Sequence, residues 1–140
     1  MSGLEYLKQV QAGGVAAAPM LALFDITLVE VSEGRVVMAA TPGAAHNNGI
    51  GIVHGGLAAT LLDTALGCAV NSMMPAGRVF TTLEVKVNFT RPILEDGGPL
   101  RCEAWVVHSG RRTATAEGRV LDGTGKLCAH ATGTWIVFSD

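Results

Sequence analysis

The segment from His46 to Pro75 has the sequence HNNGIGIVHGGLAATLLDTALGCAVNSMMP. From Leu57 to Met74 it predicts a helix that is apolar on nearly every side, and a helix without a polar face is buried all round. Asp63 lies in the middle of this helix. Because an ionised carboxylate is almost never buried unless it is paired or hydrogen-bonded, Asp63 is the residue that most needs an explanation.

The tripeptide His54-Gly55-Gly56 opens the predicted helix. The first backbone N–H groups of a helix have no intrahelical partner, and the helix dipole favours negative charge at this end. The pattern therefore indicates a place to hold an oxyanion at the start of the helix.

The size and charge of the chain restrict the classes of protein to consider. A length of 140 residues fits one domain, residues 1–140. The net charge is −2, and the sequence has no Lys/Arg cluster larger than Arg111-Arg112. Since nucleic-acid binding depends mainly on neutralising phosphates, we exclude DNA and RNA as partners.

The cysteines favour a cytoplasmic protein. Cys68, Cys102 and Cys128 are an odd number, lie far apart and stand within apolar runs, so we expect reduced thiols in a core. The histidines show no metal-ligand spacing, and we expect neither a metal nor a cofactor. Residues 1–11 lack the apolar run of a signal peptide, and polar residues interrupt 57–74, so we expect no membrane association.

The rest of the chain predicts one short helix and several strands. A helix is expected at about residues 3–12, a hairpin at 22–41 around Ser32-Glu33-Gly34, and a loop at 42–52. Four segments with period-two character follow: 81–89, 100–108, 112–121 and 126–138. Their short links predict an antiparallel meander. The expected fold class is α+β, with an antiparallel sheet curled around one long buried helix.

The alternation in the first of these segments predicts a strand with one buried side. Leu83, Val85, Val87 and Phe89 take one face, and Thr82 falls on the other face.

The spacing of Gly55 and Asp63 predicts that two chains build one site. Eight residues separate them, which is roughly 12 Å along a helix. An oxyanion donor and a base or nucleophile must both lie about 3 Å from their reacting atoms, and an aspartate is too short to close that gap. In a two-fold homodimer, Gly55 of one chain can face Asp63 of the other.

The sequence resembles the hotdog-fold acyl-CoA thioesterases over about residues 20–138. The residues that carry the resemblance are Asn48, His54-Gly55-Gly56, Asp63, the strand 82–89 (TLEVKVNF) and Arg91-Pro92. They are most similar to the HGG branch that contains the phenylacetate-pathway (PaaI-like) and 4-hydroxybenzoyl-CoA thioesterases. The resemblance implies a hotdog fold, an acyl-CoA substrate and a homodimer, commonly paired again into a homotetramer.

The resemblance also implies roles for single residues. The Gly55 N–H polarises the thioester carbonyl, and Asp63 is the nucleophile or the general base. Asn48 orients the lytic water or the thioester, and Thr82 assists the carboxylate. Thr81 lies on the opposite strand face, so a register error of one residue would exchange it with Thr82.

Other positions have both a functional and a structural interpretation. His54 is either a catalytic residue or a local hydrogen-bonding residue, and Asn48 either orients water or shapes its turn. The turn Gly110-Arg111-Arg112 lies where family members contact the CoA moiety, and cations there suit its phosphates.

Three function classes are consistent with these residues. The first is an enzyme that hydrolyses an acyl- or arylacyl-CoA thioester to the free acid and CoA. The second is a hotdog acyl-thioester hydratase or dehydratase, which needs a histidine and an acid working as a pair. The third is a non-catalytic acyl-CoA-binding protein.

Overall fold

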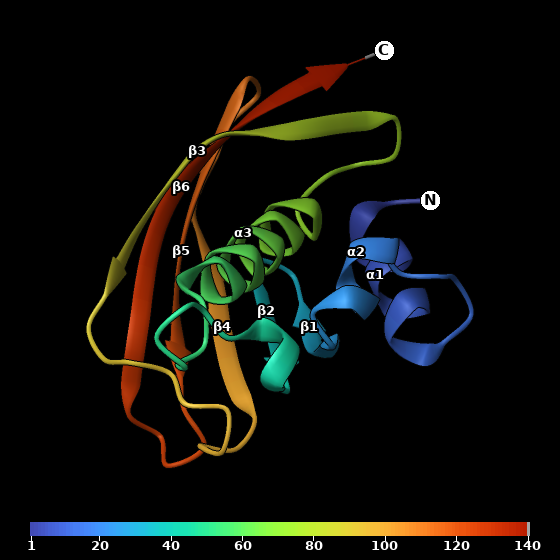
Figure 1. Ribbon diagram of the computed structural model, residues 1–140. Helices are drawn as coiled ribbons and strands as arrows, with labels where there is room; N and C mark the ends of the chain where they lie inside the picture. Colours follow the sequence, from blue (N-terminus) through green and yellow to red (C-terminus); the bar gives the residue numbers. More distant parts are fainter. Residues whose placement is uncertain (140) are drawn as a thin grey trace.

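The computed structural model describes residues 1–139 and has an antiparallel sheet that curls around one helix, α3 (Gly55–Asn71) (Figure 1). The strands are β1 (Ile26–Ser32), β2 (Arg35–Ala40), β3 (Arg78–Phe89), β4 (Leu100–Ser109), β5 (Thr113–Leu121) and β6 (Leu127–Ser139), in the order β1-β2-β4-β5-β6-β3. Two short helices, α1 (Gly3–Ala12) and α2 (Pro19–Leu23), stand beside β1, and a 3₁₀ turn, η1 (Ala44–His46), precedes α3. The expected α+β class and the expected elements are confirmed.

The predicted meander is correct only for β4, β5 and β6. The strand β3 pairs with β6, and β4 pairs with β2, so β3 and β4 are not neighbours. Residues 90–99 are too many for a tight hairpin and instead cross the end of the sheet. On the way, the carbonyl oxygen of Ile93 accepts from the Val53 N–H, which ties the crossing to the loop before α3.

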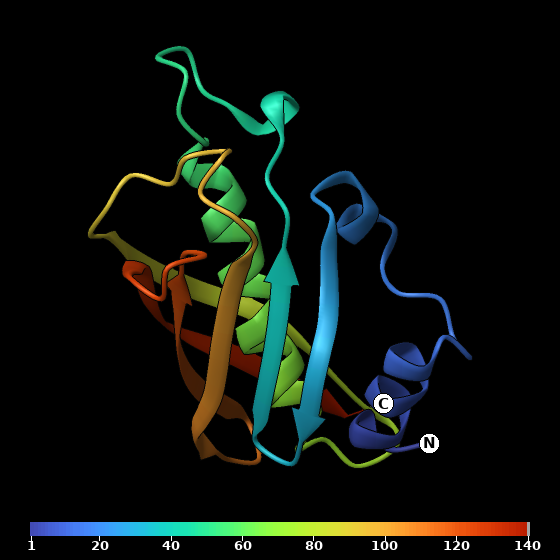
Figure 2. The ribbon, with the colours of Figure 1, turned by 90° about the horizontal axis from the view of Figure 1, so that it is seen from below.

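One side of α3 forms the centre of the core. Leu57, Leu61, Leu62 and Leu66 are at most 1% exposed. Strands of the sheet pass over α3 (Figure 2). The sheet approaches closely because Gly118 of β5 has no side chain: a Cβ there would lie 2.5 Å from Leu66 Cδ1. The close approach fixes α3 against the sheet.

The prediction that α3 is buried on every side is wrong for this protomer. Thr60, Thr64 and Asn71 are only half-buried, and Asp63 is exposed. The sheet curls over one side of α3, and the other side is open along the edge strand β3. Small residues such as Ala59 stand among the polar residues of that open side, so the sequence shows no clear polar face.

A β-bulge in β3 changes which side chains face α3, so the predicted faces of this strand are wrong before the bulge. Thr82 pairs with Trp135 and Glu84 pairs with Thr134, so Leu83 is an extra residue. The alternation therefore changes phase at Leu83: Thr82 before it and Val85 after it both face α3. Leu83, predicted on the buried face, is 58% exposed.

Within residues 1–139, no helix is both long enough and apolar enough to cross a membrane.

A charged cluster lies on the face of the sheet turned away from α3. Glu103 of β4 accepts from Arg119 at 2.8 Å and from Arg101 at 3.1 Å, and Arg35 lies 3.7 Å away. The Glu103 side chain is 11% exposed, whereas the three arginines are about half exposed. The hydrogen bond from Arg119, followed by that from Arg101, holds the pKa of Glu103 below its ordinary value.

We expect Glu103→Gln to lower the free energy of unfolding at pH 7 by about 1.5–3 kcal/mol, the range for hydrogen bonds to a charged group. Because the pKa of Glu103 is lowered by folding, its contribution is complete above pH 4.5 and is lost as the pH falls further. The difference between wild type and variant, measured by urea unfolding at fixed protein concentration, should narrow below pH 4.5. Glu30→Gln, at an exposed position of β1, is the control; equal losses in both variants would contradict the assignment.

Candidate active site

Asp63 of α3 and Thr82 of β3 form a polar pair on the open side of the helix. The Thr82 hydroxyl donates to Asp63 Oδ1 at 2.9 Å. Both side chains line two adjoining cavities, of about 500 and 280 Å³. The second carboxylate oxygen, Oδ2, has no hydrogen-bond partner among residues 1–139. A solvent-accessible carboxylate oriented by a hydroxyl group is suited to act as a nucleophile or a base.

The bulge at Leu83 decides which threonine reaches the carboxylate. Thr81 pairs with Ile136 and Thr82 with the buried Trp135, so the two threonines lie on opposite faces of β3. Without the extra residue, Thr82 would share a face with Glu84, whose carboxylate accepts from Thr134.

At the N-terminus of α3, the backbone N–H of Gly55 points out of the helix without a partner among residues 1–139. His54 is the N-cap: its Nδ1 accepts from the Gly56 N–H at 2.8 Å, and its carbonyl oxygen accepts from the Leu57 N–H at 3.0 Å. This Gly55 donor, at the positive end of the helix dipole, is placed to receive an oxyanion.

His54 is therefore positioned as a cap, and its Nδ1 is already occupied. Gly56 makes the cap possible, because a Cβ at this position would lie 2.9 Å from His54 Nδ1. The adjacent His46 is also structural: Nδ1 accepts from the Gly43 N–H, and its ring stacks on Phe24.

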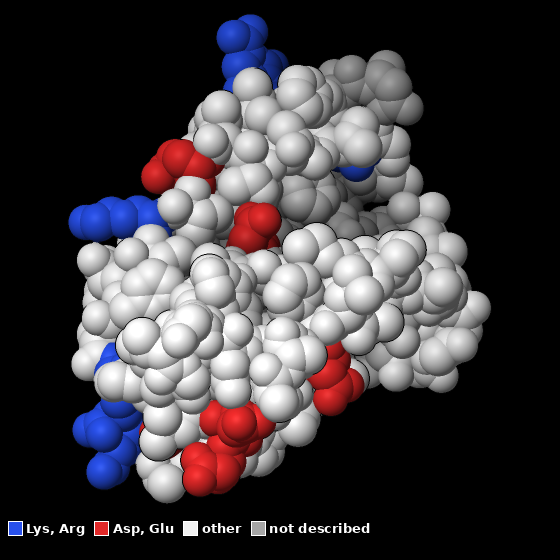
Figure 3. Space-filling view, viewed as in Figure 1, with Lys and Arg blue, Asp and Glu red and all other residues white. Residues whose placement is uncertain are grey.

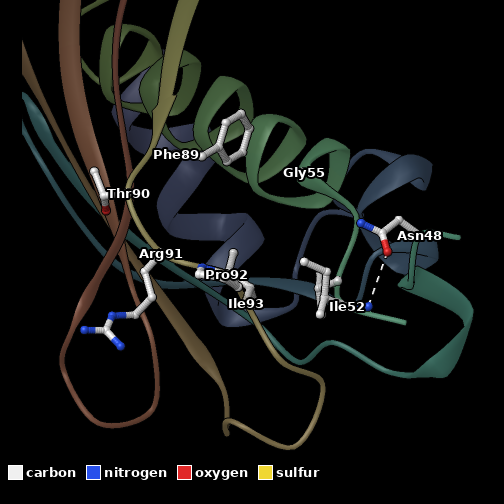
Figure 4. A pocket seen from close by; sticks show the side chains of 9 residues that line it. Asn48, Ile52, Gly55, Phe89, Thr90, Arg91, Pro92 and Ile93 are labelled. Atoms are coloured by element: carbon white, nitrogen blue, oxygen red, sulfur yellow. Dashed lines mark hydrogen bonds between the residues drawn. The ribbon is translucent and has the colours of Figure 1, made fainter. Parts of the chain in front are cut away.

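Asn48 shapes the loop before α3, and its side-chain Nδ2 has no hydrogen-bond partner among residues 1–139. Its Oδ1 accepts from the N–H groups of Ile50 and Ile52, at 3.0 and 3.3 Å. These two bonds fix which side-chain atom is oxygen and leave Nδ2 on the side that faces Gly55 (Figure 4). Asn48 can therefore shape its loop through Oδ1 and still orient water or the thioester through Nδ2.

Gly55 and Asn48 line a cavity of about 380 Å³, named here the Gly55 cavity. Its lining also includes Phe89 and Arg91, which the sequence analysis did not assign to the site. The Phe89 ring would lie 3.2 Å from a Cβ at position 55, so it packs against the backbone of Gly55. Arg91 is exposed at the rim, with its guanidinium directed away from Asn48 (Figure 4). Only the pairing of β3 with β6 brings Phe89 to the helix start, and no sequence pattern predicts that pairing.

Within one protomer, the Gly55 cavity and the two cavities at Asp63 have no lining residue in common. The oxyanion donor and the carboxylate therefore open onto different parts of the surface, as the spacing along α3 predicts.

The turn Gly110-Arg111-Arg112 lies at the opposite end of β3 from Gly55. Arg111 and Arg112 line a cavity of about 440 Å³ with Arg78, the first residue of β3. The Arg78 guanidinium donates to the Arg111 carbonyl oxygen at 3.1 Å. Arg78 is a third cation that sequence reasoning missed, since this contact joins two segments 33 residues apart.

The three cysteines are free thiols that are unsuited to nucleophilic chemistry. Burial raises the pKa of Cys68 to about 11 and raises the pKa of Cys102 further. Within the described part of the chain, no cluster of His, Cys, Asp and Glu side chains is placed to bind a metal.

Comparisons with known proteins identify the family of the chain. Residues 50–129 match the family model described as "Thioesterase superfamily". Human acyl-coenzyme A thioesterase 13 is 30% identical over 113 residues, which are 80% of this chain and 79% of that protein. The Saccharolobus solfataricus protein SSO1253 is 36% identical over 90 residues, which are 64% of this chain but only 58% of that protein.

Solved structures show the same fold. The PaaI protein of the Escherichia coli phenylacetic acid degradation operon has a TM-score of 0.85 and 25% identity, covering 99% of this chain and 97% of that chain. A thioesterase family protein from Silicibacter pomeroyi has a TM-score of 0.84 and 27% identity, covering 95% and 98%. The expected hotdog fold is confirmed.

The capping role of His54 predicts how its variants behave. His54→Ala removes the acceptor for the Gly56 N–H and should lower the free energy of unfolding by about 1 kcal/mol, whereas His54→Asn, a good N-cap, should restore most of this loss. Thermal or urea unfolding at equal protein concentration measures both. An asparagine variant as unstable as the alanine variant would show that the cap is not what His54 supplies.

Proposed function

We propose that this protein is a thioester hydrolase that converts an acyl-CoA to the free acid and CoA. The proposal starts from its family, because the chain belongs to the thioesterase superfamily. The observation that carries the proposal is the pairing of Thr82 with an exposed Asp63. A carboxylate that is oriented but not neutralised by a cation keeps its charge available for an incoming thioester.

The reaction requires an attacking oxygen and stabilisation of the developing negative charge. The Gly55 N–H donates to the thioester carbonyl oxygen, with the dipole of α3 adding to the stabilisation. Asp63 provides the attack, held in place by the Thr82 hydroxyl. The C–S bond then breaks, and CoA leaves as the thiol after its sulfur takes up a proton, which the lytic water supplies in the overall reaction. Asn48 Nδ2, beside Gly55, orients the carbonyl or the water.

Two routes use these same residues. In one, an Asp63 oxygen attacks the carbonyl carbon and forms an anhydride that water then hydrolyses. In the other, Asp63 takes a proton from a water molecule that attacks directly. A single turnover in ¹⁸O-labelled water distinguishes them: direct attack puts the label in the product acid, whereas hydrolysis of the anhydride at the Asp63 carbon puts it in the protein.

A homodimer is part of the proposal because the donor and the carboxylate open onto different cavities of one protomer. The edge strand β3 supports it: an edge has unpaired backbone groups, and Val79, Leu83 and Phe89 on it are 55–58% exposed. If two β3 strands pair antiparallel, the end of one strand that contains Phe89 lies beside the half of the other strand that contains Thr82. Because Phe89 packs against Gly55 of its own chain, the pairing brings that Gly55 toward Thr82 and Asp63 of the other chain. Pairing of such dimers into a homotetramer stays a prediction.

The CoA moiety is proposed to lie against Arg111 and Arg112, with Gly110 in the same turn. Arg78 extends this cluster, and three guanidinium groups around one cavity suit a phosphorylated nucleotide. We place the protein in the cytoplasm, where free thiols persist.

A hydratase is less consistent with the geometry than a hydrolase. A hydratase needs a histidine that transfers protons together with the acid, and His54 Nδ1 instead accepts the Gly56 N–H at its own helix start. A non-catalytic binder would have no use for a hydroxyl that orients Asp63.

The experiment that tests the function is hydrolysis of a panel of acyl-CoAs, with CoA release measured by a thiol reagent. Asp63→Asn should lower kcat by about 10²–10⁴, the usual contribution of a general base. Thr82→Val should lower it by about 10–100-fold, the equivalent of one hydrogen bond to a charged group. Thr81→Val is the matched control and should act like wild type. A folded Asp63→Asn protein with full activity would refute the assignment.

A further inference from the structure

A cavity of about 310 Å³ lies between α1, α2, β1 and α3, and the proposed catalytic residues do not line it. We name it the N-terminal cavity. Among residues 1–139, its lining contains no Asp, Glu, Lys or Arg and is mostly apolar; it includes Leu7, Val10, Leu21, Leu28 and Met38. A volume near 300 Å³ is at the lower end of the range for small-molecule sites.

The N-terminal cavity adjoins the carboxylate. Tyr6, Leu7, Thr64 and Cys68 line both this cavity and the 280 Å³ cavity that contains Asp63 and Thr82. Thr64 is the residue after Asp63 on α3, and Cys68 lies one turn further along. The face over α1, α2 and α3 is largely uncharged, and most Lys and Arg side chains stand at its margin (Figure 3). A hydrophobic group could therefore pass from Asp63 into the cavity without meeting a charge.

The two ends of α1 are fixed, and the cavity lies beside the helix between them. At the start, the Gly3 N–H donates to the Met74 carbonyl oxygen at 3.0 Å, and a Cβ on Gly3 would lie 1.8 Å from the Asn71 carbonyl oxygen. At the end, Gln11 Nε2 donates to the Val29 carbonyl oxygen. The cavity is thus built into the fold, and it is not a gap left by a loosely attached helix.

We infer that the N-terminal cavity holds the acyl part of the substrate and that its apolar lining and its volume select uncharged, apolar acyl groups of limited length. The inference rests on the proposed function, because it takes the thioester to lie at Asp63. Each methylene buried there should raise kcat/KM about fourfold until the cavity is full. Charged acyl groups should be rejected, since the cavity offers them no partner.

The test fills the cavity from α1. Val10→Phe adds a ring at a half-buried lining position, and Gln9→Phe adds the same ring at an exposed position that does not line the cavity. The readout is the ratio of kcat/KM for octanoyl-CoA to kcat/KM for propionyl-CoA. Wild type and Gln9→Phe should have the same high ratio, and Val10→Phe should lower it at least tenfold. An unchanged ratio in Val10→Phe would overturn the inference while leaving the hydrolase proposal intact.

A binding measurement separates this inference from the proposed chemistry. S-octyl-CoA and S-methyl-CoA are thioethers that cannot be hydrolysed, so their affinities do not depend on catalysis. Calorimetry should show at least tenfold tighter binding of the octyl compound to wild type and Gln9→Phe, and a smaller preference in Val10→Phe. Equal affinities for both thioethers in wild type would overturn the inference, whether or not the protein releases CoA from thioesters.

Discussion

The arrangement of this molecule depends on one constraint: α3 must be packed on one side and open on the other. The leucines of its buried side meet the curled sheet, and Gly118 allows the two backbones to approach. The open side keeps Asp63 in water, which avoids the cost of burying a charge. The bulge at Leu83 then brings the Thr82 hydroxyl to that carboxylate. A side chain that must keep its charge thus stays on a rigid, mostly buried element.

Much of this arrangement could be predicted from the sequence. The apolar run after His54-Gly55-Gly56 gave the central helix and its oxyanion-binding start, and the spacing of Gly55 and Asp63 placed them too far apart for one chain. Thr82 came from the family resemblance alone, because strict alternation put it on the wrong strand face. A bulge adds a residue without a sequence signal of its own, so the phase change at Leu83 could not be foreseen. The open side of α3 was also missed, since its small residues resemble core residues.

The sequence also did not predict that β3 pairs with β6, nor the contacts that depend on this pairing. Link length predicts neighbours only for tight hairpins, and residues 90–99 cross the end of the sheet instead. Phe89 at Gly55 and Arg78 at Arg111 follow from that crossing. The central claim, that a donor from one chain and a carboxylate from another meet on one thioester, rests on the spacing of Gly55 and Asp63 along α3 and on the separate cavities onto which they open. The Gly55→Pro variant tests this claim, because proline has no N–H and therefore removes the donor. The backbone accommodates the change, since proline is favoured at the first helical position and His54 already has the extended ψ of 134° that suits a residue before proline.

The most direct measurement uses mixed dimers of Gly55→Pro and Asp63→Asn chains, co-expressed with two tags and purified through both. Each parent protein should be inactive, because every site lacks either the donor or the carboxylate. A mixed dimer contains one site with Gly55 from one chain and Asp63 from the other, both intact, so about half of the wild-type activity should return. Gly55→Ala, which keeps the N–H and adds the same Cβ against Phe89, controls for packing. Activity in the mixed dimer no higher than in its parents would contradict a site shared between chains.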